Sequence, residues 1–172
     1  MASVAGGYLC GAVRYELDGK PKIAVSCHCR DCQYVSGGAP AHVLIMRAED
    51  VVITKGSLKG YSTISAKGNR IGRLFCENCG TPVFAKNEKH PEVLPIKVGS
   101  LDDPSRFRTQ ANIWNASAQP WHCFDAAVPR FKHDPDINLN ALIELVRSQA
   151  VKLGRAARLF ATADRDGADR TA

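Results

Sequence analysis

Three cysteines lie close together in the segment VSCHCRDCQ, at Cys27, Cys29 and Cys32, in a Cys-x-Cys-x-x-Cys pattern. Thiolates are preferred ligands of Zn²⁺, and a loop this compact can wrap around one ion. Structural zinc sites are closed by four protein ligands, whereas catalytic sites use three and leave the fourth position to water or substrate. The three cysteines therefore predict a metal site that is complete if its fourth position serves chemistry.

A second group of cysteines consists of Cys76 and Cys79, in the segment FCENCGTPVF, together with Cys10 in GGYLCGAVRY. A glycine follows both Cys10 and Cys79. Cys-x-x-Cys followed by glycine is a turn that points two thiolates toward one ion. The chain contains two Cys-x-x-Cys elements, Cys29 with Cys32 and Cys76 with Cys79, and an extra Cys-x-Cys element. It is therefore predicted to bind zinc.

The spacing alone leaves two partitions of these cysteines open. One partition is a single closed site in a non-catalytic binding module, with Cys10 and Cys27 spare; its ligands are Cys29, Cys32, Cys76 and Cys79. The other partition has two sites, an open one and a second one; their ligands are Cys27, Cys29 and Cys32, and Cys10, Cys76 and Cys79.

Short β-rich runs separated by turn residues predict a mainly β fold with antiparallel strands. The expected strands cover residues 13–17, 22–25, 41–46, 51–54, 70–75, 81–84 and 94–98. The tail differs, because apolar residues follow Asp134 and Asp136 at helical spacing. We therefore expect a zinc-binding β domain over residues 1–135, a C-terminal α-helix over 136–163 and a flexible tail over 164–172.

Composition narrows the class of protein. The chain has 172 residues, of which 45% are hydrophobic and 23% charged, as expected for a globular domain. It contains seven cysteines and no recognisable signal peptide, so the thiols are predicted to serve metal binding or catalysis in the cytoplasm rather than disulfides. No apolar run is long enough to span a membrane. The net charge of +6 is spread along the chain, and this distribution argues against a nucleic-acid partner.

Five segments, in order along the chain, give it a family resemblance. They are GGYLCGAVRY, SCHCRDCQYVSG, RLFCENCGTPVF, VGSLDDP and ANIWNASAQPW with VPRF. The sequence resembles the glutathione-dependent formaldehyde-activating enzyme family, which also includes centromere-protein-V-like proteins. The resemblance covers roughly residues 3–135 and implies a β-tent fold with two zinc sites.

The resemblance also assigns roles to the cysteines. It implies an open catalytic zinc on Cys27, Cys29 and Cys32. The structural zinc would use Cys10, Cys76 and Cys79. The family's first element reads Gly-x-Cys-x-Cys-Gly, and here Tyr8 stands at the position of the fourth structural ligand. A neutral phenol is a poor zinc ligand beside thiolate, so one or two zinc ions are expected per chain.

Three thiolates give a bound zinc a net negative charge, which makes it a weak activator of water but a soft partner for an incoming thiol. This chemistry matches what the resemblance implies: a carbon–sulfur lyase acting on adducts of a thiol such as glutathione with a small aldehyde such as formaldehyde. An anionic thiol requires nearby cations. Arg30 and Arg73 are the candidates, and Trp114 is a candidate pocket wall.

Other residues near the motifs are expected to be structural. His28 is predicted to be a loop residue that binds no metal, and His122 belongs to no spacing pattern. Trp121 and Cys123 are expected to be buried. Two further functions stay open: a non-catalytic zinc module that binds nucleic acid or protein, and a methionine-sulfoxide-reductase-like enzyme that uses Cys123 as its nucleophile.

Overall fold

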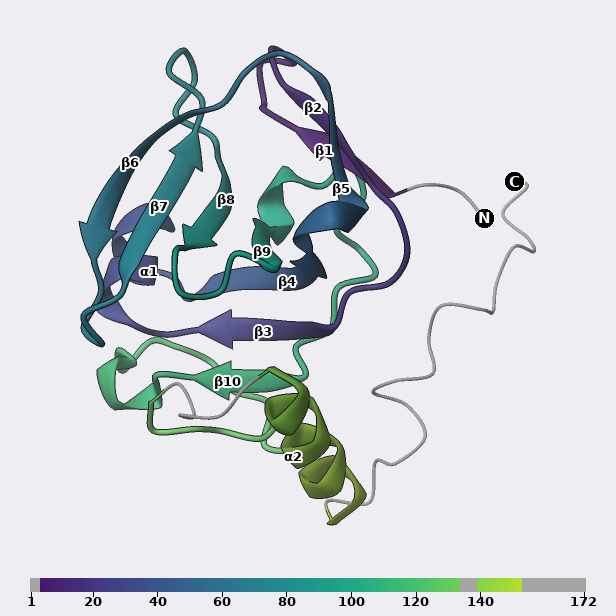
Figure 1. The fold of residues 1–172 in the computed structure, drawn as a ribbon. Coiled ribbons are helices and arrows are strands. Elements are labelled where there is room, and N and C mark those ends of the chain that lie inside the picture. The colour runs from purple at the N-terminus through teal and green to yellow at the C-terminus, as the bar shows by residue number, and fades with distance from the viewer. Residues whose placement is uncertain (1–3, 134–138, 153–172) are drawn as a thin grey trace, which may run out of the picture.

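The computed structural model describes residues 4–133 and 139–152, which form two β-sheets, a short helix and a C-terminal helix (Figure 1). One sheet has three strands in the order β1-β2-β5, and the other has seven in the order β10-β3-β4-β9-β8-β7-β6. The strands are β1 (Val4–Gly7), β2 (Arg14–Leu17), β3 (Ile23–Cys27), β4 (Ala41–Arg47), β5 (Val51–Lys55), β6 (Lys59–Ile64), β7 (Arg70–Phe75), β8 (Pro82–Asn87), β9 (Val93–Lys97) and β10 (Ala111–Ile113). The helices are α1 (Arg30–Val35) and α2 (Leu139–Lys152).

The mainly β prediction is confirmed, and every expected strand overlaps an observed one. Sequence reasoning missed β1, β6 and β10, and also α1, which lies inside the predicted metal loop. The strand pairing also needs a correction, because β10 runs parallel to β3, with Ala111 opposite Val25 and Ile113 opposite Cys27. A parallel pair needs a long connection. Here the chain between β3 and β10 includes most of the domain. Because Ile113 lies opposite Cys27, the residues that follow Ile113 lie next to the cysteine loop that follows β3.

The main core fills the space between the two sheets. Val13, Tyr15 and Leu17 of the smaller sheet meet Met46 and Phe84 of the larger one. The rings of Tyr15 and Phe84 have centroids 5.0 Å apart. The Tyr15 hydroxyl lies 2.7 Å from the Ser100 hydroxyl, so the one polar atom of this ring is satisfied in the core.

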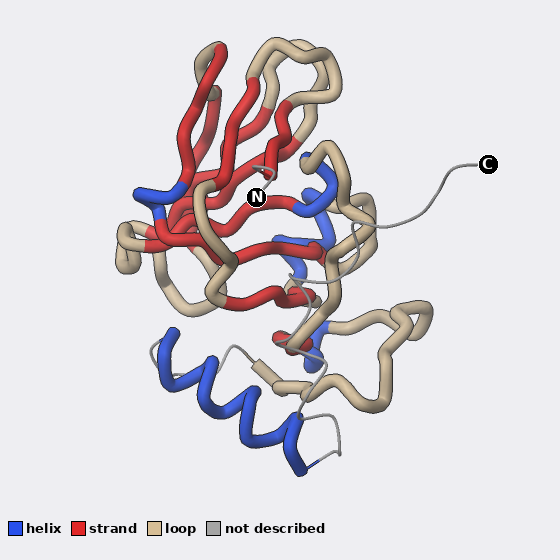
Figure 2. Tube along the Cα trace, turned by 90° about the vertical axis from the view of Figure 1, so that its right-hand side faces the viewer, coloured by secondary structure: helices blue, strands red, loops and turns tan. Residues whose placement is uncertain are grey.

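A second core lies on the opposite face of β3 and β4, beside helix α2 (Figures 1 and 2). Ile23 and Val25 of β3 pack there, while the intervening Ala24 faces the main core, as the two-residue period of a strand requires. Leu142, Ile143 and Val146 of α2 supply the other side. The strand is therefore buried on both faces.

The predicted C-terminal helix is present as α2. The expected caps at Asp134 and Asp136, the rest of the predicted helix beyond 152 and the tail over 164–172 lie outside the described residues. Among the residues that are described, no helix combines the length and apolar character needed to cross a membrane.

Close packing of β1 against Ser100 and the Tyr15 ring depends on Gly6. A Cβ added there would lie less than 3.0 Å from the Ser100 carbonyl oxygen and from the Tyr15 ring. We expect Gly6→Ala to lower the free energy of unfolding by about 1–3 kcal/mol through overpacking. Urea denaturation measures the change. Gly99→Ala is the control, because its Cβ would meet no atom within 4 Å. Equal stability of the two variants would contradict the packing argument.

Candidate metal centres and active site

The first cysteine cluster lies where β3 passes into α1. Cys27 is the last residue of β3, Cys29 is the N-cap of α1, and Cys32 lies in its first turn. The Sγ atom of Cys29 accepts a hydrogen bond from the Cys32 amide at 3.4 Å. The three Sγ atoms lie within 4.8 Å of one another.

This arrangement fits a tetrahedral thiophilic ion. With zinc–sulfur bonds of about 2.3 Å, tetrahedral geometry places sulfurs about 3.8 Å apart, inside the observed limit. Of the ligand types His, Cys, Asp and Glu, no fourth residue among those described joins this group. The cluster could therefore hold a metal ion with one coordination position left over.

Charge around the cluster favours thiolate. Hydrogen bonds from the thiols of Cys27 and Cys29, helped by the positive charges of Lys97 and Arg73, lower the pKa of Cys32 to about 3. The pKa of Cys27 is raised well above its ordinary value, chiefly by its hydrogen bond to Cys29. Of the three thiols, Cys32 therefore carries the negative charge of the cluster when no ion is bound.

A pocket of about 240 Å³ lies near the first cluster: no cysteine is in its lining, but two of its lining residues, Lys97 and Arg73, act electrostatically on Cys32. Its lining residues come from α1, the strands β6 to β9 and the β7–β8 turn: Tyr34, Val35, Tyr61, Arg73, Leu74, Phe75, Gly80, Pro82, Phe84 and Lys97. Most of this wall is aromatic or aliphatic, and two residues are cationic. The same two cations act on Cys32 electrostatically, so the pocket and the cluster share one charged environment.

Lys97, at the end of β9, was missed by sequence reasoning. Its side chain is buried, with a relative exposure of 8%. Burial lowers the pKa of Lys97, while the nearby Cys32 opposes that shift. A lysine in a strand has no motif to mark it, and only the three-dimensional position gives it significance. It places a cation in the pocket wall beside three sulfurs.

The three predicted substrate-binding residues occupy different places. Arg73 lines the pocket and forms an ion pair with Asp31 at 3.1 Å. Arg30 is outside the lining; it donates a hydrogen bond to Gln33, and its guanidinium lies 5.2 Å from the Tyr34 ring centroid. Trp114 also lies outside the lining. Its backbone adopts φ 62°, in the left-handed region, and its ring packs against His133.

Two histidines that seemed unrelated in sequence form a buried pair behind the cluster. The Nδ1 atoms of His28 and His122 lie 2.9 Å apart. His28 Nε2 lies 3.1 Å from the side-chain oxygen of Asn112, and His122 Nε2 lies 3.0 Å from the Gly38 carbonyl oxygen. The ring of Phe124 stacks on His28. His28 is thus a fully buried anchor of this segment, and it stays outside the metal-ligand group.

Two expectations for this region were wrong. Trp121 has a relative exposure of 67%, although a buried position was predicted. Cys123 is also exposed, not buried. Trp121 and Cys123 flank the buried His122 in a surface loop, and their apolar character does not bury them there.

The second cluster joins the two sheets. Cys10 lies in the β1–β2 connection, and Cys76 and Cys79 lie in the β7–β8 turn. Their Sγ atoms also lie within 4.8 Å of one another, and those of Cys10 and Cys76 are 3.6 Å apart. The structure therefore groups the cysteines as two sets of three, as in the second of the two partitions.

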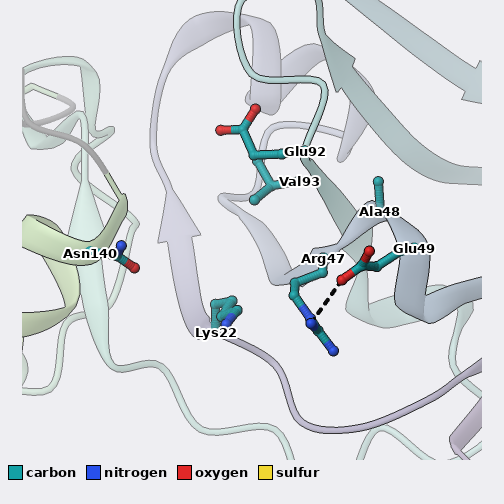
Figure 3. Close-up of a pocket in the computed structure, with 7 residues that line it drawn as sticks. All are labelled: Lys22, Arg47, Ala48, Glu49, Glu92, Val93 and Asn140. Carbon is teal, nitrogen blue, oxygen red and sulfur yellow. Dashed lines mark ion pairs between the residues drawn. The ribbon is translucent and has the colours of Figure 1, made fainter.

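A larger pocket, of about 460 Å³, lies elsewhere on the molecule (Figure 3). It is lined by Lys22, Arg47, Ala48, Glu49, Glu92, Val93 and Asn140. Arg47 is already paired with Glu49 at 2.8 Å and with Asp50 at 2.7 Å. The smaller pocket is the better candidate site despite its size, because its Lys97 and Arg73 act electrostatically on Cys32 of the first cluster.

Gln33 connects the loop of the first cysteine cluster to the segment that precedes His122. It is buried, and its side-chain amide donates hydrogen bonds to the carbonyl oxygens of His28 at 2.7 Å and Ser117 at 2.8 Å.

Replacing Gln33 by methionine keeps the side-chain volume but leaves both carbonyl oxygens without this donor. We expect a loss of about 1–3 kcal/mol in the free energy of unfolding, measured by urea denaturation. The neighbouring Tyr34→Phe, at a position 79% exposed, should change stability by less than about 0.5 kcal/mol. Equal stability of Gln33→Met and Tyr34→Phe would show that the hydrogen bonds of Gln33 to the His28 and Ser117 carbonyl oxygens do not stabilise the fold.

Comparison with known proteins gives one family match. The family model described as "Glutathione-dependent formaldehyde-activating enzyme" matches residues 3–117, more than half of the chain and a range that includes both cysteine clusters. The chain is also similar to a Rhodobacter sphaeroides protein of known crystal structure, with 24% identity and a TM-score of 0.47, over 57% of this chain and 87% of that one. No curated protein matches the chain.

Proposed function

The chain belongs to the glutathione-dependent formaldehyde-activating enzyme family, and we propose that it is a carbon–sulfur lyase. Its reaction would form and cleave the adduct of a small thiol, such as glutathione, with a small aldehyde, such as formaldehyde. The observation that carries this proposal is the set of three cysteine sulfurs beside a pocket with two cations in its wall. The sulfurs supply a site for a thiol, and the cations suit an anionic substrate.

Cys27, Cys29 and Cys32 are the proposed ligands of a catalytic Zn²⁺. When bound there, the ion would provide a soft Lewis-acidic centre that lowers the pKa of an incoming thiol at its open position. Three thiolates make the centre anionic, so a negatively charged thiol would be repelled unless cations compensate. Lys97 and Arg73 are placed to compensate, since both lower the pKa of Cys32.

The proposed step is addition of a thiol to a carbonyl group. The thiol gives up its proton, its sulfur forms a bond to the carbonyl carbon, and the carbon–oxygen π bond breaks. The oxygen then takes up one proton, so the product is a neutral hydroxymethyl thioether and the step is balanced. Cleavage is the reverse. The pocket residues stabilise the charge that develops on oxygen and sulfur during this step.

Lys97 is the cation we assign to this electrostatic role. Its ammonium is buried, and charge acts more strongly where water is excluded. Arg73 is shared with Asp31, so it contributes less free charge and is better suited to binding a substrate carboxylate. Tyr34 and Tyr61 line the pocket together with Arg73 and contribute to its aromatic wall. Arg30 and Trp114 remain predicted substrate contacts outside this lining.

Removal of one ligand tests the metal. Cys29→Ser should lower the zinc content by one ion per chain and reduce catalysed adduct exchange to the uncatalysed rate. Elemental analysis measures the first, and nuclear magnetic resonance exchange spectroscopy of glutathione with formaldehyde measures the second. The matched control is Cys123→Ser, outside both clusters, which should keep zinc and activity. Full activity without metal in the cluster would rule the mechanism out.

Removal of the buried charge tests the pocket. We expect Lys97→Gln to reduce kcat/KM for adduct formation by about 10- to 1000-fold, because it removes one preorganised charge from the site. Zinc content should stay unchanged, which separates loss of charge from loss of metal. Lys86→Gln, at an exposed position on the neighbouring β8, is the control. Unaltered kinetics in Lys97→Gln would remove Lys97 from the mechanism.

A further inference from the structure

The second cluster differs from the first in its surroundings. Cys10 is exposed and Cys79 is partly exposed, while Cys76 is buried. Each half of the cluster is a tight turn: the Gly11 amide donates to the Tyr8 carbonyl oxygen at 2.9 Å, and the Gly80 amide donates to the Cys76 carbonyl oxygen at 2.9 Å. These turns bring three sulfurs together, with Cys10 on the exposed side of the cluster.

Tyr8 stands at the sequence position of the missing fourth ligand but cannot serve as a ligand. Its side chain is buried, and its hydroxyl donates a hydrogen bond to the Phe75 carbonyl oxygen at 2.8 Å. A protonated phenol whose hydrogen is already donated does not compete with thiolate for a metal.

Thr81 is the other oxygen beside the cluster, and it is also engaged. Its hydroxyl oxygen accepts a hydrogen bond from the Leu9 amide at 3.2 Å and lies 3.1 Å from Cys79 Sγ. Among the described residues, no further His, Cys, Asp or Glu joins the group.

We infer that the second cluster is an open metal site, which binds Zn²⁺ or a similar thiophilic ion through Cys10, Cys76 and Cys79 and takes its fourth ligand from solution. A closed site surrounds its ion with protein ligands. Here one of the three ligands, Cys10, is exposed, so solvent reaches the cluster. The ion therefore exchanges with other metals and with chelators far more readily than a four-thiolate ion would.

The exchangeable ion also acts as a link between the sheets. Cys10 belongs to the smaller sheet's β1–β2 connection, and its two partners belong to the larger sheet. The Tyr8–Phe75 and Leu9–Thr81 hydrogen bonds also join the two sheets at this junction. Stability should therefore rise with free zinc concentration, as for any ligand that binds only the folded state.

The test converts the open site into a closed one. Tyr8→Cys supplies a fourth thiol, and Tyr8→Phe is the matched control that removes only the hydroxyl. Zinc-loaded proteins are mixed with a chromogenic zinc chelator, and release is followed by absorbance. Cys29→Ser identifies the phase that belongs to the first cluster. We expect a fast phase from the second cluster in the wild type and in Tyr8→Phe, slowed by roughly 10- to 100-fold in Tyr8→Cys.

A second measurement does not depend on the folding of Tyr8→Cys. In Cys29→Ser loaded with Co²⁺, the absorbance reports the second cluster alone, and added imidazole should change its spectrum by occupying the open position. A spectrum of four thiolates that ignores imidazole would overturn the inference. Failure of the cluster to bind Zn²⁺ or Co²⁺ would overturn it as well. Both results leave the proposed lyase at the first cluster untouched.

Discussion

The burial of β3 on both faces is the constraint on which the rest of the structure depends. All five residues of Ile23–Cys27 are buried, with Ala24 in the core between the sheets and Ile23 and Val25 in the core beside α2. A shift of one residue in register would exchange the two faces, so that Ile23 and Val25 would overfill the space that fits Ala24 and would leave gaps in the core beside α2. Because the register is fixed in this way, Cys27 is held at the end of the strand, and the metal loop begins from a rigid point.

The two cysteine clusters share a ligand type and differ in what surrounds them. The first adjoins two cations, a hydrophobic pocket and a buried pair of histidines. The second lies at the surface between two turns, with one oxygen donor and one buried phenol beside it. A set of three cysteines therefore suits substrate binding in the first cluster and an exchangeable link between the sheets in the second. Environment, more than ligand identity, separates the two proposed roles.

Local patterns predicted the parts of the structure that depend on local chemistry. The strand periodicity identified β2 to β5 and β7 to β9, and the cysteine motifs marked the residues that the structure brings together in two groups of three, although spacing alone left their partition open. The weak points were elements too short for a pattern, such as β10 and α1, and contacts between distant residues. His28 and His122 are 94 positions apart, and Lys97 faces Cys32 only because β9 pairs with β4, which pairs with β3. Such contacts follow from topology, which spacing does not encode.

The cap of α1 gives metal binding a further meaning. A helix of six residues, Arg30–Val35, is too short to be stable alone, since nucleation costs more than its few hydrogen bonds return. Its first turn is fixed by Cys29 and Cys32, which an ion would hold in place. The same helix carries Tyr34 and Val35, one wall of the pocket. An ion bound by the cluster would add a tie across the first turn of this helix, so metal binding and the formation of one pocket wall would be coupled.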